Sequence, residues 1–130
     1  MAKPGKYIGE CPFEAAMQVL EGKWKLMILH QLCERGTMRF KELERRIPNI
    51  NPGMLTKELK ALEESGMIER HAYATIPPTV EYSLSEFGAT LKPVVASICD
   101  WGRLHMDKFQ QASCSLVNEE VTGGDCEERL

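Results

Sequence analysis

The segment from residue 50 to residue 66 carries the start, the end and both faces of a single helix. Asn51 suits the N-cap because its side-chain oxygen can accept a free backbone N–H of the first turn. Pro52 suits the first helical position, and Gly66 suits the left-handed residue that ends a helix. Leucines at i, i+4 and i+7 form a stripe for the core: Leu55, Leu59 and Leu62. The segment therefore predicts a capped, amphipathic helix.

The outer face of this helix is small and basic in its N-terminal half and acidic in its C-terminal half. Its residues are Gly53, Lys57, Lys60 and Glu64. A recognition helix that enters the DNA major groove by its N-terminal end has this arrangement. An ordinary solvated surface helix has it as well, so the helix alone leaves both interpretations open.

The residues on either side of the helix predict a winged helix-turn-helix. Upstream, a short helical stripe of Phe40, Leu43 and Ile47 ends at Pro48, which leaves a short turn before the next helix. Downstream, apolar and polar residues alternate over residues 80–84, as in a half-buried strand. A loop with two prolines joins this strand to a preceding one and places the prolines at the tip of a β-hairpin. The expected fold is mainly α with a small β-hairpin (α+β).

The remaining helices are expected to form the scaffold. A first helix over residues 11–20 has an apolar stripe of Phe13, Ala16, Met17 and Leu20. A second helix over residues 23–33 has Trp24, Ile28 and Leu32 on one face, and Met27 and Leu29 are also apolar. We therefore expect other elements to surround most of it, and Gly36 should end it. Ser85 is expected to cap the last helix, which Pro93 should bend or restart.

The last helix carries more apolar surface than three helices and a hairpin can cover from one side. The residues of this stripe are Leu91, Val94, Val95, Ile98, Trp101, Met106 and Phe109. We expect the excess to form a homodimer interface, in which the last helix, with Ile98 and Trp101, and the N-terminal region pair across a two-fold axis. The alternative is a helix that folds back and covers the stripe within one chain.

Charge is distributed unevenly along the chain, which has a formal net charge of −3. Between Arg35 and Lys60 there are seven basic and three acidic residues, a net of +4. From Val117 to Leu130 there are five acidic residues and one arginine, a net of −4. A basic region on a helix-turn-helix is the electrostatic feature expected of a phosphate-binding surface.

Length and composition predict one small domain. With 130 residues, 43% of them hydrophobic, the chain can bury a single core, and dimerisation would add to it. We expect a flexible arm at residues 1–10, a DNA-binding and dimerisation domain at residues 11–112, and an acidic, disordered tail at residues 113–130. The chain lacks a run of about 18 apolar residues and a signal segment, so a cytoplasmic protein without membrane contact is expected.

Several short fragments, in order and at the right spacing, resemble the HxlR-type family of winged-helix transcriptional regulators. The fragments that carry the resemblance are Cys11-Pro12, Gly22-Lys23-Trp24, Arg39-Phe40-Lys41-Glu42-Leu43, Ile47-Pro48, Met54-Leu55-Thr56, Leu59, Leu62-Glu63, Gly66, Pro77-Pro78, Val80-Glu81-Tyr82-Ser83-Leu84, Phe87-Gly88-Ala89-Thr90-Leu91 and Trp101. The resemblance implies a dimeric regulator, most simply a repressor, that binds a palindromic operator in double-stranded DNA. The sequence identifies neither an inducer nor the regulated genes.

Two positions depart from the pattern of this family. The family commonly has Ser-x-Arg where this chain has Asn51-Pro52-Gly53, and an arginine where this chain has Thr79. Both arginines would be expected to reach DNA. Their absence affects the expected affinity and the base sequence recognised, whereas the core positions all match.

The expected DNA contacts follow from these placements. Asn51, Thr56 and Lys57 are expected to face bases in the major groove, with Pro52 and Gly53 letting the backbone approach closely. The residues expected to touch phosphates are Arg39, Lys41, Lys60, Arg70 and His71.

The five cysteines are scattered, without a C-x-x-C pair, so no metal site, cofactor or disulfide framework is expected. Cys33 and Cys99 lie on apolar helices and are interpreted as buried small hydrophobes, and Cys114 and Cys126 lie in the tail. Cys11 precedes a helix whose N-terminal N–H groups favour a thiolate. It also matches the cysteine that senses oxidants or quinones in redox-responsive members of the family. The alternative is a cysteine merely tolerated at the cap.

Nothing in the sequence indicates an enzyme. It contains no glycine-rich phosphate loop, no Gly-x-Ser-x-Gly and no paired carboxylates suited to a cleft. His30 and His105 lie on apolar helices and are interpreted as core or interface residues. The main alternative to a DNA-binding regulator is a winged helix that contacts another protein.

Overall fold

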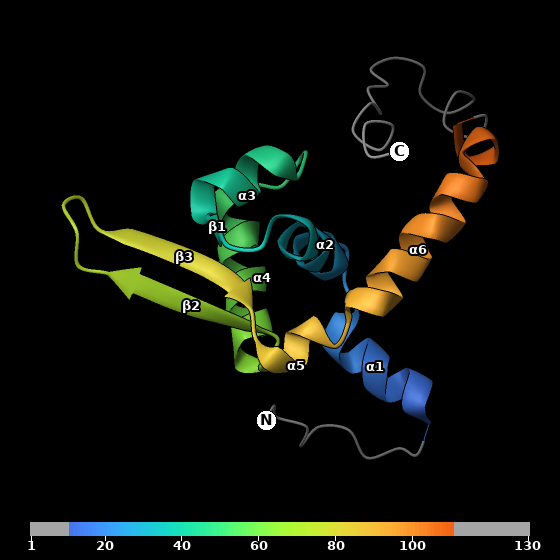
Figure 1. Cartoon of the computed structure of the whole chain (residues 1–130), viewed down its shortest axis with the longest axis horizontal. Helices are drawn as coiled ribbons and strands as arrows, with labels where there is room; N and C mark the ends of the chain where they lie inside the picture. The colour runs from blue at the N-terminus through green and yellow to red at the C-terminus, as the bar shows by residue number, and fades with distance from the viewer. Residues whose placement is uncertain (1–10, 111–130) are drawn as a thin grey trace. The chain divides into compact units, whose positions relative to one another are not determined.

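The computed structural model describes residues 11–110. The elements in chain order are α1 (Pro12–Leu20), α2 (Lys25–Arg35), β1 (Met38–Arg39), α3 (Phe40–Arg46), α4 (Pro52–Glu64), β2 (Ile68–Tyr73), β3 (Thr79–Leu84), α5 (Glu86–Ala89) and α6 (Lys92–Leu104) (Figure 1). The chain falls into two compact units, one ending at Lys92 and the other beginning at Pro93, and each is described by itself. None of the helices in residues 11–110 has both the length and the apolar character that a membrane crossing needs.

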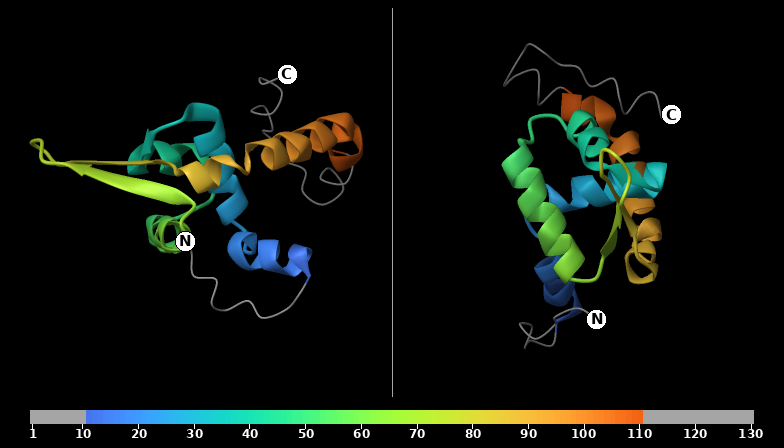
Figure 2. Two further views of the ribbon diagram at one scale, coloured as in Figure 1. Left: turned by 60° about the horizontal axis from the view of Figure 1, so that its bottom comes forward. Right: turned by 90° about the vertical axis from the view of Figure 1, so that its left-hand side faces the viewer.

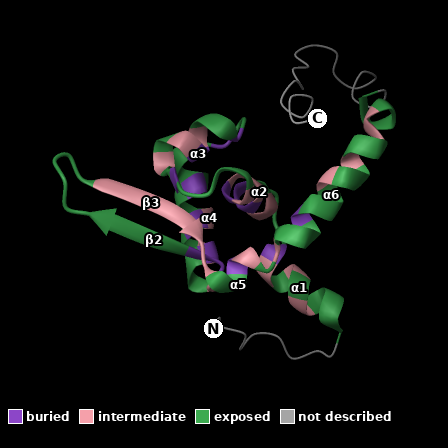
Figure 3. Cartoon of the chain, in the orientation of Figure 1, coloured by how far each residue is buried: buried purple, intermediate pink, exposed green. Residues whose placement is uncertain are grey.

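The core of the first unit lies where α2, α3 and α4 meet the sheet (Figure 3). Leu55, Leu59 and Leu62 of α4 are fully buried, as the stripe predicts. Trp24 at the N-cap of α2 is buried with them, as are the facing residues of α2 and α3: Ile28, Leu29, Leu32 and Leu43. Burying an aliphatic side chain of this size stabilises the fold by about 1.5–3 kcal/mol, so this cluster fixes how α4 sits on its neighbours.

The predicted ends of α4 are confirmed. The Met54 N–H donates a hydrogen bond of 2.8 Å to Asn51 Oδ1, and Pro52 occupies the first helical position. Gly66, with φ of +83°, follows the C-cap residue Ser65 in the left-handed region that favours glycine. The short turn before α4 contains Asn49, a residue type that tolerates its φ of +68°.

The sheet has three antiparallel strands in the order β1-β3-β2, so the expectation of a two-stranded hairpin alone was incomplete. The additional strand, β1, pairs Met38 with Tyr82 and Arg39 with Glu81. Strands β2 and β3 form the expected hairpin, and both prolines lie in the loop between Tyr73 and Thr79. The hairpin projects away from the helices of its unit (Figure 1).

The first helix, α1, is less buried than its apolar stripe predicts. Leu20 is buried and Met17 packs against the core, but Ala16 is exposed and the side chain of Phe13 is 69% exposed. The N-terminal half of this stripe is therefore exposed in the described chain, and pairing of the N-terminal region with a second subunit stays a prediction. The next helix, α2, begins two residues later than expected and ends at Gly36, as predicted.

Ser85 caps a separate short helix, α5, and not the last helix. Its Oγ accepts the Gly88 N–H at 2.9 Å and donates to the Gly66 carbonyl oxygen at 2.6 Å, which ties α5 to the start of β2. Of the two outcomes expected for Pro93, a restart is the correct one, because α6 begins at Lys92.

The second unit contains α6 and the helical residues 106–110 that follow it. Its large apolar side chains are exposed along one stripe: Val94, Ile98, Trp101, Leu104 and Phe109. The Trp101 ring lies 5.5 Å from the His105 ring and 5.4 Å from the Phe109 ring, measured between centroids. The expected boundaries at residues 10 and 112, and the acidic tail, lie outside the described residues.

Candidate nucleic-acid interface

The outer face of α4 is uncovered over its whole length. Gly53, Thr56, Lys57 and Lys60 are all exposed, and the 3.6-residue period places them on one side of the helix, opposite the leucines. The right-hand view of Figure 2 shows α4 beside the hairpin, with no other element in front of it. The structure therefore brings the expected base-contacting residues of α4 onto one accessible surface.

Asn51 and Gly53 form the N-terminal end of this surface. Because Asn51 Oδ1 accepts the Met54 N–H, only the amide nitrogen of its side chain is left to donate to a base. A Cβ added at Gly53 would meet Asn51 Oδ1 at 3.4 Å, an ordinary contact. The fold therefore does not require glycine at this position.

A half-buried ion pair holds α4 against α2. Lys25 Nζ lies 2.7 Å from Glu58 Oε1, and the two side chains are only 18% and 14% exposed. The pair removes the one acidic residue in the first half of α4 from the outer surface. Sequence reasoning missed it, because the two residues are 33 positions apart and nothing local marks them as partners.

The wing residues Arg70 and His71 lie on opposite faces of the hairpin, because neighbouring residues of a strand alternate. His71 pairs across the sheet with Glu81, and Glu81 pairs in turn with Arg39 of β1. Arg39 Nε lies 3.8 Å from Glu81 Oε2, and His71 Nε2 lies 3.4 Å from Glu69 Oε1. The structure therefore groups Arg39 and His71 with two carboxylates on one face and leaves Arg70 on the other.

The charges that stay available are on the helices and on the Arg70 face. Within residues 11–110, no carboxylate forms an ion pair with the exposed cations Lys41, Lys57, Lys60 and Arg70. Exposed ion pairs contribute little, so Glu81 and Glu69 lower the positive potential of this face without removing Arg39 or His71 from contact with a ligand.

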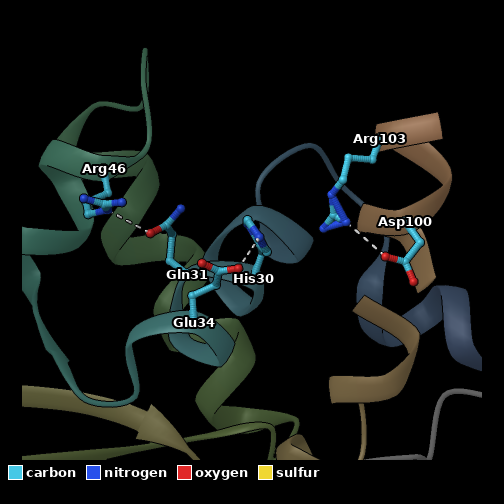
Figure 4. A network of polar contacts seen from close by, with 6 residues as sticks. All are labelled: His30, Gln31, Glu34, Arg46, Asp100 and Arg103. Carbon is cyan, nitrogen blue, oxygen red and sulfur yellow. Dashed lines mark hydrogen bonds and ion pairs between the residues drawn. The ribbon is translucent and has the colours of Figure 1, made fainter. Parts of the chain in front are cut away.

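The other polar pairs join neighbouring helices or turns and do not converge on a site (Figure 4). On α2, His30 Nε2 lies 3.4 Å from Glu34 Oε2, and Arg46 Nε of α3 donates to Gln31 Oε1 at 3.1 Å. In the second unit, Arg103 forms an ion pair of 3.0 Å with Asp100. Residues 11–110 contain no group of three His, Cys, Asp or Glu side chains that could hold a metal ion.

Cys11 occupies the N-cap position of α1 and is exposed, with its carbonyl oxygen accepting the Ala15 N–H at 3.1 Å. Cys33 and Cys99 are half-buried, so the expectation of fully buried side chains was too strong. Cys114 and Cys126 lie outside the described residues.

A helix-turn-helix followed by a sheet with a projecting hairpin defines a winged helix, a class of fold that presents its recognition helix to DNA. The chain belongs to the HxlR-like helix-turn-helix family, whose model matches residues 19–110. It is a helix-turn-helix transcriptional regulator, as the resemblance in its sequence predicted.

Individual relatives agree with this assignment. The chain is 40% identical over 110 residues to the HTH-type transcriptional regulator YdeP of Bacillus subtilis, covering 85% of each protein. Its structure is similar to that of the redox regulator HypR in its reduced form, with a TM-score of 0.71 and 40% identity over 78% of this chain and 99% of that one. It is also similar to the reduced form of the transcriptional regulator YodB from B. subtilis, with a TM-score of 0.62 and 36% identity over 72% and 92% of the two chains.

Proposed function

We propose that the chain is a cytoplasmic repressor that binds a palindromic operator as a homodimer, with α4 of each subunit in the major groove. The observation that carries the proposal is the uncovered face of α4, where Gly53 exposes the backbone next to Lys57 and Lys60, which form no ion pair within residues 11–110. A duplex presents a continuous array of phosphates at the edges of the groove, which this small and basic surface complements. Occupation of the operator would exclude polymerase.

Base contacts would come from Asn51, Thr56 and Lys57. Lys57 can donate to the O6 and N7 atoms of a guanine, and the Asn51 amide nitrogen can donate to an acceptor on a base edge. Pro52 and Gly53 would bring the helix end close to the bases, because neither adds a bulky side chain to the groove.

Phosphate contacts would come from Lys41, Lys60 and Arg70, with smaller contributions from Arg39 and His71. The two latter residues share their face of the sheet with Glu81 and Glu69, which weaken the local positive potential. The wing would therefore bind phosphates chiefly through Arg70.

The experiment that tests this function is footprinting of the protein on the DNA around its own gene, followed by mobility-shift titrations at several salt concentrations. We expect one protected palindrome and a steep fall in affinity as salt rises, since each phosphate contact releases counterions. The winged helix could instead serve as a protein-interaction module. Bulk DNA at low salt that leaves the protein unbound would favour this alternative.

The first prediction concerns Lys57. Replacing Lys57 with alanine should cost about 1–3 kcal/mol of operator affinity and relax specificity at one base pair, if the side chain contacts a guanine. The measurement is a titration against operators that carry each base at that position. Lys92→Ala, which removes an exposed lysine outside α4, is the matched control and should bind as the wild type does.

The outcomes of this experiment separate three roles for Lys57. A uniform loss over all sequences, with a salt slope lowered by about one unit, would make Lys57 a phosphate contact. No loss at all would contradict the placement of this face of α4 in the groove.

A second prediction concerns Cys11, which we propose as a thiol switch. Support comes from its exposed position at a helix N-terminus and from the similarity of the chain to the redox regulator HypR. Diamide would take two electrons and two protons from two thiols, joining Cys11 to the partner subunit's Cys11 or to a cysteine of the tail. If α1 packs at the dimer interface, a new covalent bond at its start would change the distance between the two recognition helices and move them out of register with successive major grooves.

Diamide should weaken operator binding by the wild type about 5- to 150-fold, the usual range of coupling between two sites. Cys11→Ser should keep its affinity under the same treatment, and reductant should restore the wild type. Cys99→Ser, which leaves Cys11 in place, is the matched control and should respond like the wild type. Equal release of DNA by the wild type and Cys11→Ser would show that Cys11 is not the sensor.

A further inference from the structure

The tip of the hairpin is apolar and uncharged. Residues 74–78 contain no charged side chain, and the Ile76 side chain at the tip is 97% exposed. Tyr73, where β2 ends, is also exposed. Single exposed hydrophobic residues are common on protein surfaces. Ile76 differs from them because it stands at the end of the element that projects farthest from the helices of its unit (Figure 1).

Hydrogen bonds and prolines order the loop that carries Ile76. Thr75 Oγ1 donates to the Pro77 carbonyl oxygen at 2.7 Å and lies 3.0 Å from Thr79 Oγ1. Pro77 and Pro78 restrict the backbone further, because each ring fixes its φ angle. An ordered loop loses little conformational entropy when it binds, so Ile76 is presented ready for contact.

The hairpin reaches out beside the recognition helix. In the right-hand view of Figure 2, which faces the side from which the hairpin projects, the hairpin and α4 lie next to each other. Six residues of an extended strand span roughly 20 Å, enough to cross from one groove of a duplex to the next. A duplex held on the outer face of α4 would therefore have the hairpin tip at a neighbouring groove.

We propose that the tip of the hairpin is an apolar wedge, and that Ile76 packs into the minor groove beside the half-site and bends the duplex there. This inference rests on the proposed DNA binding. An uncharged tip cannot neutralise phosphates, so its favourable contacts are with the sugars and base edges on the groove floor. Isoleucine and proline are among the side chains that proteins insert at base steps to unstack and kink DNA.

The wedge makes a distinctive prediction about salt. Ile76→Ser should weaken operator binding on the order of tenfold, the loss expected for a partly buried aliphatic contact. The slope of affinity against salt should stay unchanged, because no counterion is released by an apolar contact. Ile76→Val keeps an apolar tip and should bind and bend DNA as the wild type does. Because Ile76 is almost fully exposed, neither change should alter the thermal stability of the protein.

The test uses the full chain and the operator duplex found by footprinting, with 2-aminopurine placed at the flexible pyrimidine–purine steps that flank the half-site. Saturating binding of the wild type and of Ile76→Val should raise the fluorescence of the probe and make the mobility of circularly permuted fragments depend on the position of the site, whereas bound Ile76→Ser should do neither. An Ile76→Ser protein that binds and bends the operator like the wild type would overturn the wedge and leave the proposed function standing. A wild-type chain that binds no duplex would overturn both. Loss of repression in cells with unchanged DNA binding and bending would also overturn the wedge, and would assign the tip to a protein partner.

Discussion

Gly88→Ala should lower the free energy of unfolding by about 3 kcal/mol or more, a large part of the stability of a small domain. A Cβ at position 88 would lie 2.0 Å from the Met67 carbonyl oxygen and 3.0 Å from its carbonyl carbon. Both atoms belong to the backbone, so no side-chain rotation can relieve the contact. The helix α5 would have to move away from the start of β2.

That movement would also break hydrogen bonds. Ser85 donates its backbone N–H to the Met67 carbonyl oxygen at 3.0 Å and its hydroxyl to the Gly66 carbonyl oxygen at 2.6 Å. Each such bond contributes about 0.5–1.5 kcal/mol, and a buried group left without a partner costs more. Met67 itself is buried in the core, so the displacement would extend into the packing beneath α4.

Thermal unfolding followed by circular dichroism measures this effect, and the midpoint of Gly88→Ala should fall by about 10 °C or more. Gly53→Ala is the matched control, since a Cβ there makes only an ordinary contact and alanine favours the helix. A midpoint for Gly88→Ala within about 2 °C of the wild type would contradict the close approach of α5 to Met67.

The elements that the sequence predicted well are those whose signals are local. Asn51, Pro52 and Gly66 mark the ends of α4 by their backbone preferences, and the leucine stripe marks its buried face. The two prolines between Tyr73 and Thr79 place the hairpin loop by the same logic. Each of these residues acts on its own segment, so its effect does not depend on the rest of the fold.

The features that the sequence did not reveal depend on contacts between distant segments. Strand β1 has only two residues, too few to show a period, and it exists because Met38 and Arg39 pair with a strand more than 40 positions away. The Lys25–Glu58 ion pair likewise has no local signal. The placement of Arg70 and His71 on opposite faces of the hairpin could have been predicted from the sequence, because neighbouring residues of a strand alternate between its two faces.

The exposure of Phe13 shows a further limit of pattern analysis. An apolar stripe on a helix indicates a face that is buried, but the pattern does not say whether the same chain or a second copy covers it. The stripe of α6, exposed at Ile98 and Trp101, raises the same question on a larger scale.

Ile98→Glu combined with Trp101→Glu should convert the protein to a monomer and weaken operator binding on the order of a thousandfold, as two interface hot spots of about 2 kcal/mol each would. In the described chain these side chains are 49% and 60% exposed, an unusual amount for an isoleucine and a tryptophan on one stripe. A glutamate in an apolar interface loses its hydration without gaining a partner, so the dimer is strongly disfavoured. A monomer then binds one half-site without the help of the second.

Sedimentation velocity at micromolar concentration measures the assembly, and circular dichroism checks that the double variant is still folded. Ala96→Glu is the matched control, because Ala96 is exposed and lies two residues from Ile98, on another side of α6. The dimer should place its two recognition helices roughly 34–36 Å apart, so the half-sites of the operator should be centred about 10–10.5 base pairs apart or at a multiple of that spacing. A wild type that sediments only as a monomer, or a double variant that stays dimeric, would contradict this interface. If the double variant is still a dimer, the dimer must form through another surface. The spacing of the half-sites would then reflect the geometry of that other interface.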